Sequence, residues 1–318
     1  MTFMKSIGVA IAAVAAWTGA AMAEPLPYPQ KVVTLVTHSS PGGGSDVFLR
    51  ELARYLGKYI GATFVVENVQ GGSGAKAVAR VAQAPADGSV FYATTPTYIY
   101  TSLLSKLQYS YKELDPLVNI FADSEVVFTR ADGPFKTLQD VVDHARSSRG
   151  RWGAANPASL ERQAAEQLRK AAGVKAAVVT HEGGGDMMIN VLNGTLDIGV
   201  GEIAELRSQL DAKKLRLLAT FNPHRIDAYP DVPTVQEAGF DVTLVKFRGL
   251  AGPKGIPDAV KKIWDQGIAA LLKDPEYKKV YDQDVLVPDL MPHDKYPGFV
   301  NAFADGIARF MEETKAAK

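Results

Sequence analysis

The chain has 318 residues, of which 47% are apolar and 22% charged, ordinary values for a globular protein large enough to form two hydrophobic cores. Lysine and arginine together number 35, as do aspartate and glutamate, and this balance argues against nucleic acid or an anionic membrane as a partner. The absence of cysteine excludes disulfides, thiolate metal sites, a cysteine nucleophile and a lipid-modified cysteine.

The first 23 residues have the composition of a signal peptide. Lys5 is their only charge, an apolar stretch covers 7–17, and residues 21–23 read Ala-Met-Ala, a small-x-small cleavage pattern. We therefore predict cleavage after Ala23 and export to the periplasm, where a large core makes disulfides unnecessary. A retained N-terminal anchor is the alternative, although the apolar stretch is short for a membrane span.

The first part of the mature chain alternates strands with helices. Short β-branched or aromatic runs predict buried strands, and apolar residues at helical spacing predict the helices between them. The strands are expected at 32–36, 64–66 and 90–93, and the helices at 48–60 and 75–84. Such alternation predicts parallel strands in a doubly wound sheet.

The same alternation returns in the second part of the chain. Strands are expected at 126–128, 152–155, 176–180, 196–200 and 215–220, and helices at 138–146, at 159–172 and in a segment ending at 192. A loop at 223–233 and a mostly helical part from 257 follow. The predicted fold class is α/β with two doubly wound lobes. Residues 24–125 and 250–318 form the first lobe and 126–249 the second, with crossovers near 123–130 and 245–252.

The loop between the first strand and the first helix is the strongest candidate for a ligand site. Residues 39–46 read Ser-Ser-Pro-Gly-Gly-Gly-Ser-Asp, and the glycines let a ligand approach the backbone. With Ser45 or Asp46 as the cap, the free amides of the helix start predict an anion site without a basic side chain. No Gly-Lys-Ser/Thr follows, and Val47 stands where a dinucleotide-binding motif needs glycine. A tight connection that binds nothing is the alternative.

Two loops of the second lobe also lie between a strand and a helix. In the first, Asn156 or Ser159 is expected to cap the helix, and Arg162, one turn inside, either contacts a ligand or faces solvent. In the second, residues 182–186 read Glu-Gly-Gly-Gly-Asp, with Asp186 as the expected cap. Because open α/β sheets bind ligands at the carboxyl ends of their strands, we expect the three loops to share one ligand.

Catalytic patterns are weak in this sequence. It has neither His-Glu-x-x-His nor Gly-x-Ser-x-Gly, and its five histidines lack metal-binding spacing. Adjacent residues of an extended segment point to opposite faces, which argues against His181 and Glu182 as an acid–base pair. We therefore predict a binding protein that is not an enzyme and uses no cofactor or metal. A periplasmic hydrolase or isomerase that uses His38 or His181 is the alternative.

Taken together, the segments resemble the substrate-binding receptors of tripartite tricarboxylate transporters, the Bug family of periplasmic proteins. The resemblance covers nearly the whole mature chain and rests on the order and spacing of its motifs. These are YPQK at 28–31, PGGGSD at 41–46, VVEN at 65–68, GGSG at 71–74, APADG at 84–88, VLNGTLD at 191–197, PDVPT at 230–234, EAG at 237–239 and GPKGIP at 252–257.

The resemblance implies a fold, a type of ligand and a partner. The fold is that of type II periplasmic binding proteins, a Venus flytrap with the ligand cleft between the lobes. The ligand is an organic acid or amino acid, which a monomeric receptor delivers to a membrane permease. The loop matching 39–46 holds a carboxylate, and Ser159 and the segment 180–186 add contacts. A sensor subunit that serves a signalling kinase would share this fold and is a further alternative.

This chain departs from the family pattern in four places. They are His38 and Ser39 for Pro-Phe, Arg162 for histidine, His181 and Glu182 for an aromatic and a basic residue, and Gly201 for an aspartate that can meet a ligand ammonium. Without that aspartate a carboxylate, such as a dicarboxylate or an aromatic acid, is favoured over an amino acid, unless Glu182 or Glu202 compensates. Arg162 or Arg248 could pair with a distal carboxylate.

The expected ligand contacts come from both lobes. Thr95 and Tyr98 follow a first-lobe strand and could line the cleft, although Tyr98 would fit the core equally well. The full set is His38, Ser39, Ser40, Gly42, Gly43, Gly44, Asp46, Thr95, Tyr98, Asn156, Ser159, Arg162, His181, Glu182, Gly184, Gly185, Asp186 and Arg248.

Overall fold

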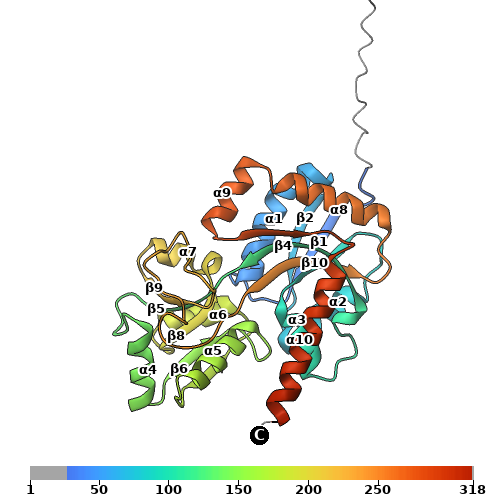
Figure 1. Cartoon of the computed structure of the whole chain (residues 1–318). Coiled ribbons are helices and arrows are strands. Elements are labelled where there is room, and N and C mark those ends of the chain that lie inside the picture. The colour runs from blue at the N-terminus through green and yellow to red at the C-terminus, as the bar shows by residue number, and fades with distance from the viewer. Residues whose placement is uncertain (1–26, 317–318) are drawn as a thin grey trace, which may run out of the picture.

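The protein folds into two α/β lobes, each built on one sheet (Figure 1). The computed structural model describes residues 27–316, so the predicted signal peptide and its cleavage site lie outside the described residues. Within those residues no helix combines the length and the apolar character needed to cross a bilayer.

The first lobe contains a six-stranded sheet in the order β11-β4-β10-β3-β1-β2. Its strands are β1 (Val32–Thr37), β2 (Thr63–Asn68), β3 (Val90–Thr94), β4 (Leu114–Asp123), β10 (Lys246–Pro253) and β11 (Val287–Met291). β1 pairs in parallel with β2 and β3, whereas β10 runs antiparallel to β3 and β4. The parallel half places the ends of β1 and β3 at one edge, where a ligand loop is expected.

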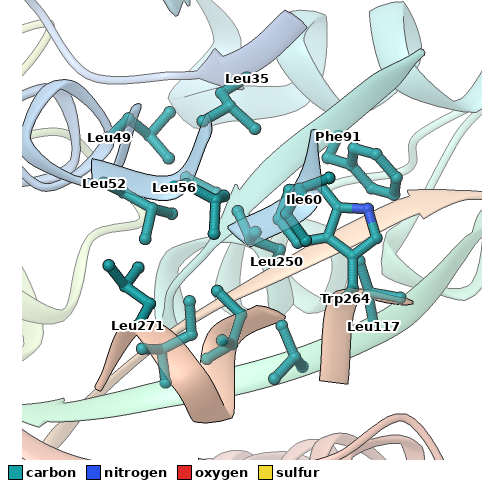
Figure 2. Close-up of a cluster of buried hydrophobic side chains, with 14 of the residues drawn as sticks. Leu35, Leu49, Leu52, Leu56, Ile60, Phe91, Leu117, Leu250, Trp264 and Leu271 are labelled. Atoms are coloured by element: carbon teal, nitrogen blue, oxygen red, sulfur yellow. The ribbon is translucent and has the colours of Figure 1, made fainter. Parts of the chain in front are cut away.

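Helices cover both faces of this sheet and enclose two apolar clusters. One face is covered by α1 (Gly44–Ile60), α8 (Asp258–Leu271) and α9 (Pro275–Gln283), and the other by α2 (Ala75–Ala82), α3 (Pro96–Leu104) and α10 (Tyr296–Ala316). Figure 2 shows the first cluster, in which Leu49, Leu52 and Leu56 of α1 lie near Leu271 of α8. This apolar spacing of three and four residues produces a buried stripe that holds α1 against the sheet.

The second lobe repeats the arrangement around five strands in the order β7-β6-β8-β5-β9. The strands are β5 (Glu125–Arg130), β6 (Arg151–Ala154), β7 (Ala177–Thr180), β8 (Ile198–Glu202) and β9 (Leu215–Thr220). α4 (Leu138–Ser147) and α5 (Leu160–Ala171) pack on one face, and α6 (Gly184–Leu192) and α7 (Ile203–Asp211) on the other. The predicted α/β class with two doubly wound lobes is therefore confirmed.

The chain passes between the lobes at two places. Ser124 alone separates β4 of the first sheet from β5 of the second, and the chain returns through residues 221–245 into β10. Because both connections lie side by side in the waist between the lobes in Figure 1, they can serve as a hinge.

The sequence interpretation missed five elements: α3, β4, α7, β10 and β11. α3 has a low helical amphipathicity because it is buried on nearly all sides, with Tyr98, Ile99 and Tyr100 in the core. The segment after Pro257 was expected to be mostly helical, yet β11 joins the edge of the first sheet by pairing with β4. Tertiary pairing overrides a short segment's local pattern in such cases.

Candidate functional site

The glycine loops of the two lobes meet backbone to backbone. A Cβ atom added to Gly183 would lie 2.4 Å from the Ser40 amide nitrogen, and one added to Gly185 would lie 2.4 Å from the Pro41 carbonyl oxygen. Across the same contact, the Asp186 amide donates a long hydrogen bond of 3.4 Å to Ser40 Oγ. The glycines are therefore needed for this close approach, and the structure represents a closed arrangement of the lobes.

A small polar cavity lies between the lobes at this contact. Its accessible volume of about 10 Å³ leaves room for about one water molecule, so a guest can enter only when the two lobes move apart. Its walls come from the strand ends and helix starts of both lobes. They are His38, Ser39, Gly44, Ser45, Thr97, Ala155, Asn156, Glu161, Gly183, Gly184, Glu202, Glu205 and Lys246.

The start of α1 has the predicted geometry but a different cap. Gly43 is the N-cap, with no side-chain cap, so the prediction that Ser45 or Asp46 caps this helix is wrong. Asp46 instead accepts hydrogen bonds from the Gly42 amide at 2.9 Å and from Asn68 Nδ2 at 2.8 Å. These bonds hold the loop in its turn. At the turn, Gly42 adopts a left-handed φ of 79°, a conformation that favours glycine.

A carboxylate from the opposite lobe occupies the α1 amide. Glu205, in the first turn of α7, accepts a hydrogen bond from the Gly44 amide at 2.8 Å through Oε2 and one from the Glu202 amide at 3.3 Å through Oε1. The predicted anion site at the α1 start is thus occupied by a carboxyl group of the protein itself, that of Glu205. The same carboxylate fills the space beside Gly201, where an added Cβ would lie 2.1 Å from Glu205 Oε1.

Lys246 forms the centre of a buried ion cluster. Its Nζ donates to Glu161 Oε1 at 2.7 Å, contacts Glu202 Oε1 and lies 3.2 Å from Glu125 Oε1. Among the described residues, oxygens of these three glutamates lie within 4.8 Å of one another, which is close enough to hold a cation. The lysine ammonium already takes that place, and all four side chains are nearly inaccessible to water.

Arg248 lies next to this cluster, behind the α1 start. Its Nε donates to Asp123 Oδ2 at 2.5 Å and its Nη1 to Ser45 Oγ at 3.3 Å. Nη2 is buried without a hydrogen bond and lies 3.5 Å from Glu202 Oε1. Because Nη2 also lies near Gly44, it extends the α1 anion site with a positive charge.

Burial and crowding shift the pKa values of this cluster. Desolvation raises the pKa of Glu205 to about 8, and repulsion from Glu161 adds to the effect. Desolvation likewise raises the pKa of Glu125 to about 8, against the attraction of Lys246. For His38, burial lowers the pKa to about 4, with a further contribution from Lys246, so its imidazole is neutral near pH 7.

Several predicted contacts lie at this cavity. His38, Ser39, Gly44, Asn156 and Gly184 line it. Four more residues border the contact between the loops: Ser40, Gly43, Gly185 and Asp186. Arg248 lies just behind the wall, whereas Gly42 and Asp46 shape the loop from outside. The two glycine loops and the loop at 156–159 are therefore brought together as the sequence predicted.

The remaining predicted contacts lie away from the cavity wall. Tyr98 is buried in the first-lobe core against Tyr92 and Tyr111, and Thr95 is the buried N-cap residue of α3. Arg162 donates to the Pro157 carbonyl at the surface. His181 Nδ1 lies 3.4 Å from the Ala154 carbonyl oxygen, and its neighbour Glu182 is exposed.

Of the two helix caps predicted in the second lobe, one is confirmed and the other is wrong. Ser159 caps α5 as predicted, because its Oγ accepts the Arg162 amide at 3.1 Å. The predicted cap role of Asp186 is wrong, since Gly183 is the N-cap of α6 and Asp186 lies in the first turn. An acidic side chain there still interacts favourably with the helix dipole.

Sequence reasoning missed three of the charged wall residues: Glu161, Glu205 and Lys246. A signal for them was present, because Glu161 and Glu205 stand in the first turns of helices that follow strands, and Lys246 stands at the second crossover. Charged residues at strand ends and crossovers should be weighed beside glycine loops, because they meet at the same edge.

The sequence profile of the tripartite tricarboxylate transporter family receptor matches residues 48–309. This chain belongs to that family. The resemblance inferred from the motifs is thereby confirmed, and the receptors of this family are solute-binding proteins.

Comparison with individual proteins supports the same assignment. A Cupriavidus necator protein, the UPF0065 protein in the gbd 5' region, is 26% identical over 318 residues, covering 98% of this chain and 93% of its own. A structure described as a periplasmic transporter has a TM-score of 0.85 at 24% identity, covering 90% and 98% of the two chains. R. palustris Rpa4515 with adipate has a TM-score of 0.84 at 24% identity, covering 91% and 98%. These likenesses confirm the periplasmic-binding-protein fold.

Among residues 27–316, no hydrogen bond joins a histidine at the cavity to a carboxylate. Nδ1 of His38 lies 2.7 Å from the Tyr92 hydroxyl rather than beside a carboxylate, and the His181 ring faces a backbone carbonyl. A hydrolase or isomerase that uses either histidine would need a partner in a different arrangement. The geometry therefore supports binding better than turnover.

Proposed function

We propose that this receptor captures a small organic carboxylate between its lobes in the periplasm and, acting as a monomer, delivers it to the permease subunits of a tripartite tricarboxylate transporter. The observation that carries the proposal is the Glu205 carboxylate on the Gly44 amide, between the lobes. A guest carboxylate can take the same amide, and the adipate in the related Rpa4515 structure is consistent with such a guest.

The proposed mechanism is capture by closure around the hinge. The division expected from the sequence, a first lobe of 24–125 and 250–318 and a second of 126–249, is kept with small shifts: Glu125 begins β5 of the second sheet, and β10 joins the first sheet from Lys246 onward, so Arg248 belongs to the first lobe. In the open form the α1 start and Arg248 present hydrogen-bond donors to the guest. Closure then adds the wall of the second lobe, with Asn156 and Gly184, and removes water from the site.

The energetics favour several contacts over one. A micromolar affinity needs about 8 kcal/mol, whereas a helix terminus contributes about 0.3–2 kcal/mol. Hydrogen bonds to charged groups contribute about 1.5–3 kcal/mol each. Contacts from both lobes are therefore required, and the proposed contacts are His38, Ser39, Ser40, Gly43, Gly44, Asn156, Gly184, Gly185 and Arg248.

A thermal-shift screen of organic acids followed by calorimetry tests the proposal. A binder raises the stability by RT ln(1 + [L]/Kd), so the thermal midpoint should rise with its concentration. Mass spectrometry of the recovered acid should find it chemically unchanged. Turnover of the acid, or no response to any carboxylate, would contradict the proposal. Loss of uptake of the bound acid in cells lacking the receptor tests delivery to the permease.

A further inference from the structure

We infer that the guest carries a positively charged nitrogen as well as a carboxylate, and that Glu161 and Glu205 bind this nitrogen. The inference rests on the proposed function, since it names the class of acid that the receptor selects. That class is amino acids and related zwitterions rather than plain mono- or dicarboxylates, which is the opposite of the preference drawn from Gly201 in the sequence.

The charged groups that line the cavity do not balance. Three acidic side chains, Glu161, Glu202 and Glu205, face the single ammonium of Lys246, and this crowding with burial raises the pKa of Glu205 to about 8, which keeps it largely protonated near pH 7. Arg248, behind the wall, is already paired with Asp123. A plain dicarboxylate would add two negative charges to a space shielded from water, where unpaired charge is most costly. A guest nitrogen with a positive charge would offset its own carboxylate and pair with the wall.

At the wall, one carboxylate is only partly satisfied and a second has no cation. Glu161 pairs with Lys246 through Oε1, whereas its Oε2 is buried without a hydrogen-bond partner. Glu205 makes no ion pair within residues 27–316. Repulsion from Glu161 contributes to the raised pKa of Glu205, so the two carboxylates interact across the cavity. Buried acceptors without partners are groups that the N–H bonds of a guest can satisfy.

The neighbouring contacts show how such a guest would lie. Lys246 demonstrates that glutamates at this wall hold an ammonium, since its Nζ contacts three of them. On the first-lobe side, two groups provide donors for a carboxylate: the Gly44 amide and Arg248 Nη2, which makes no hydrogen bond and lies 3.5 Å from Glu202 Oε1. When the guest carboxylate takes the Gly44 amide, Glu205 is released from it and can pair with the guest nitrogen.

Calorimetry with matched pairs of acids tests the inference. The probes are the common amino acids and 4-aminobutyrate, each beside the acid that lacks the amino group, such as glutarate for glutamate. We expect at least one amino member to bind about tenfold more tightly than its plain partner, or better, as one charge-assisted contact provides. Plain acids that bind as tightly as their amino partners would overturn the inference and leave the carboxylate receptor intact. No binding of any acid at about 10 mM, which saturates even a millimolar site, would overturn both.

A charge-neutral variant assigns the effect to the wall. Glu161→Gln keeps the size of the side chain, and we expect it to weaken the amino member about tenfold without weakening the plain one. Glu166→Gln is the matched control, because Glu166 lies on the same helix and is partly exposed beside Arg169. This variant should bind both members of the pair with the affinity of the wild type. Circular dichroism verifies folding. If Glu161→Gln does not fold, Glu205→Gln provides the same test, and unchanged affinity in the folded variant would contradict the assignment.

Discussion

Gly185→Ala should block closure while leaving each lobe folded. Gly185 lies in the first turn of α6, and its φ is outside the left-handed region, so alanine is compatible with the helix and raises helix propensity by up to about 1 kcal/mol. The added Cβ would lie 2.4 Å from the Pro41 carbonyl oxygen of the other lobe. Ordinary contacts begin near 3.4 Å, so the backbones must separate by about 1 Å at this point.

That separation lengthens the hydrogen bonds between the lobes, including the one from the Gly44 amide to Glu205. Loss of one charge-assisted contact to the guest costs about 1.5–3 kcal/mol, or roughly ten- to a hundredfold in affinity. Calorimetry with the tightest acid of the screen should show this loss. Small-angle scattering should show a larger radius of gyration than for the wild type with the same acid.

Gly306→Ala is the matched control for this experiment. Gly306 lies within α10, and a Cβ there meets nothing within 4 Å, so the variant gains helix propensity without a clash between the lobes. Both variants should keep the wild-type thermal midpoint or exceed it. If Gly185→Ala binds and scatters like Gly306→Ala, the closed contact between the glycine loops does not govern binding.

Further predictions concern the buried charges and the α5 cap. Lys246→Met should lower the free energy of unfolding by about 3–5 kcal/mol at pH 8, since it leaves buried carboxylates without their cation. The control Lys254→Met, at a side chain that is 63% exposed, should lower the free energy of unfolding by less than about 0.5 kcal/mol. Urea titrations followed by circular dichroism compare the two variants, and equal losses of stability would refute the role of the cluster. The pKa of Glu205 is raised by burial to about 8, so its protonated form contributes stability below the unfolded-state pKa and this contribution is lost as the pH rises through about 8. The free energy of unfolding should therefore fall between about pH 5 and pH 8 by at most about 1.4 kcal/mol per pH unit from this group and level off above pH 8. Glu205→Gln should flatten this slope, and an unchanged slope in that variant would exclude Glu205 as its source. Ser159→Ala should lower the free energy of unfolding by about 1 kcal/mol through loss of the N-cap hydrogen bond, and a thermal midpoint equal to that of the wild type would contradict this.

The elements that the sequence predicted well are those with a strong local pattern. α1 combines apolar residues at helical spacing with Gly61, whose φ of 83° and hydrogen bond to the Gly57 carbonyl end the helix. β1 is a β-branched run, and glycine-rich loops follow strands in both lobes. Such patterns are local, because they depend on backbone conformation and on the period of burial.

The elements that it missed have weak or misleading local patterns. α3 is buried on most sides and rich in aromatic and β-branched residues, which resembles a strand. Likewise, Asp186 has a favourable type of side chain for a cap, but α6 has its N-cap at Gly183, three residues earlier. Element existence can depend on packing partners that sequence spacing does not reveal.

The sequence by itself determined the α/β class, the family and the three strand–helix loops that meet between the lobes, because each of these rests on local backbone preferences or on the order of motifs. Only the tertiary structure decided the charge of the cavity. Glu161, Glu205 and Lys246 are far apart in the chain and have no shared spacing, yet they line one small cavity. Electrostatic interactions depend on distance and burial rather than on sequence separation, so the acidic wall could be recognised only once the lobes were folded against each other.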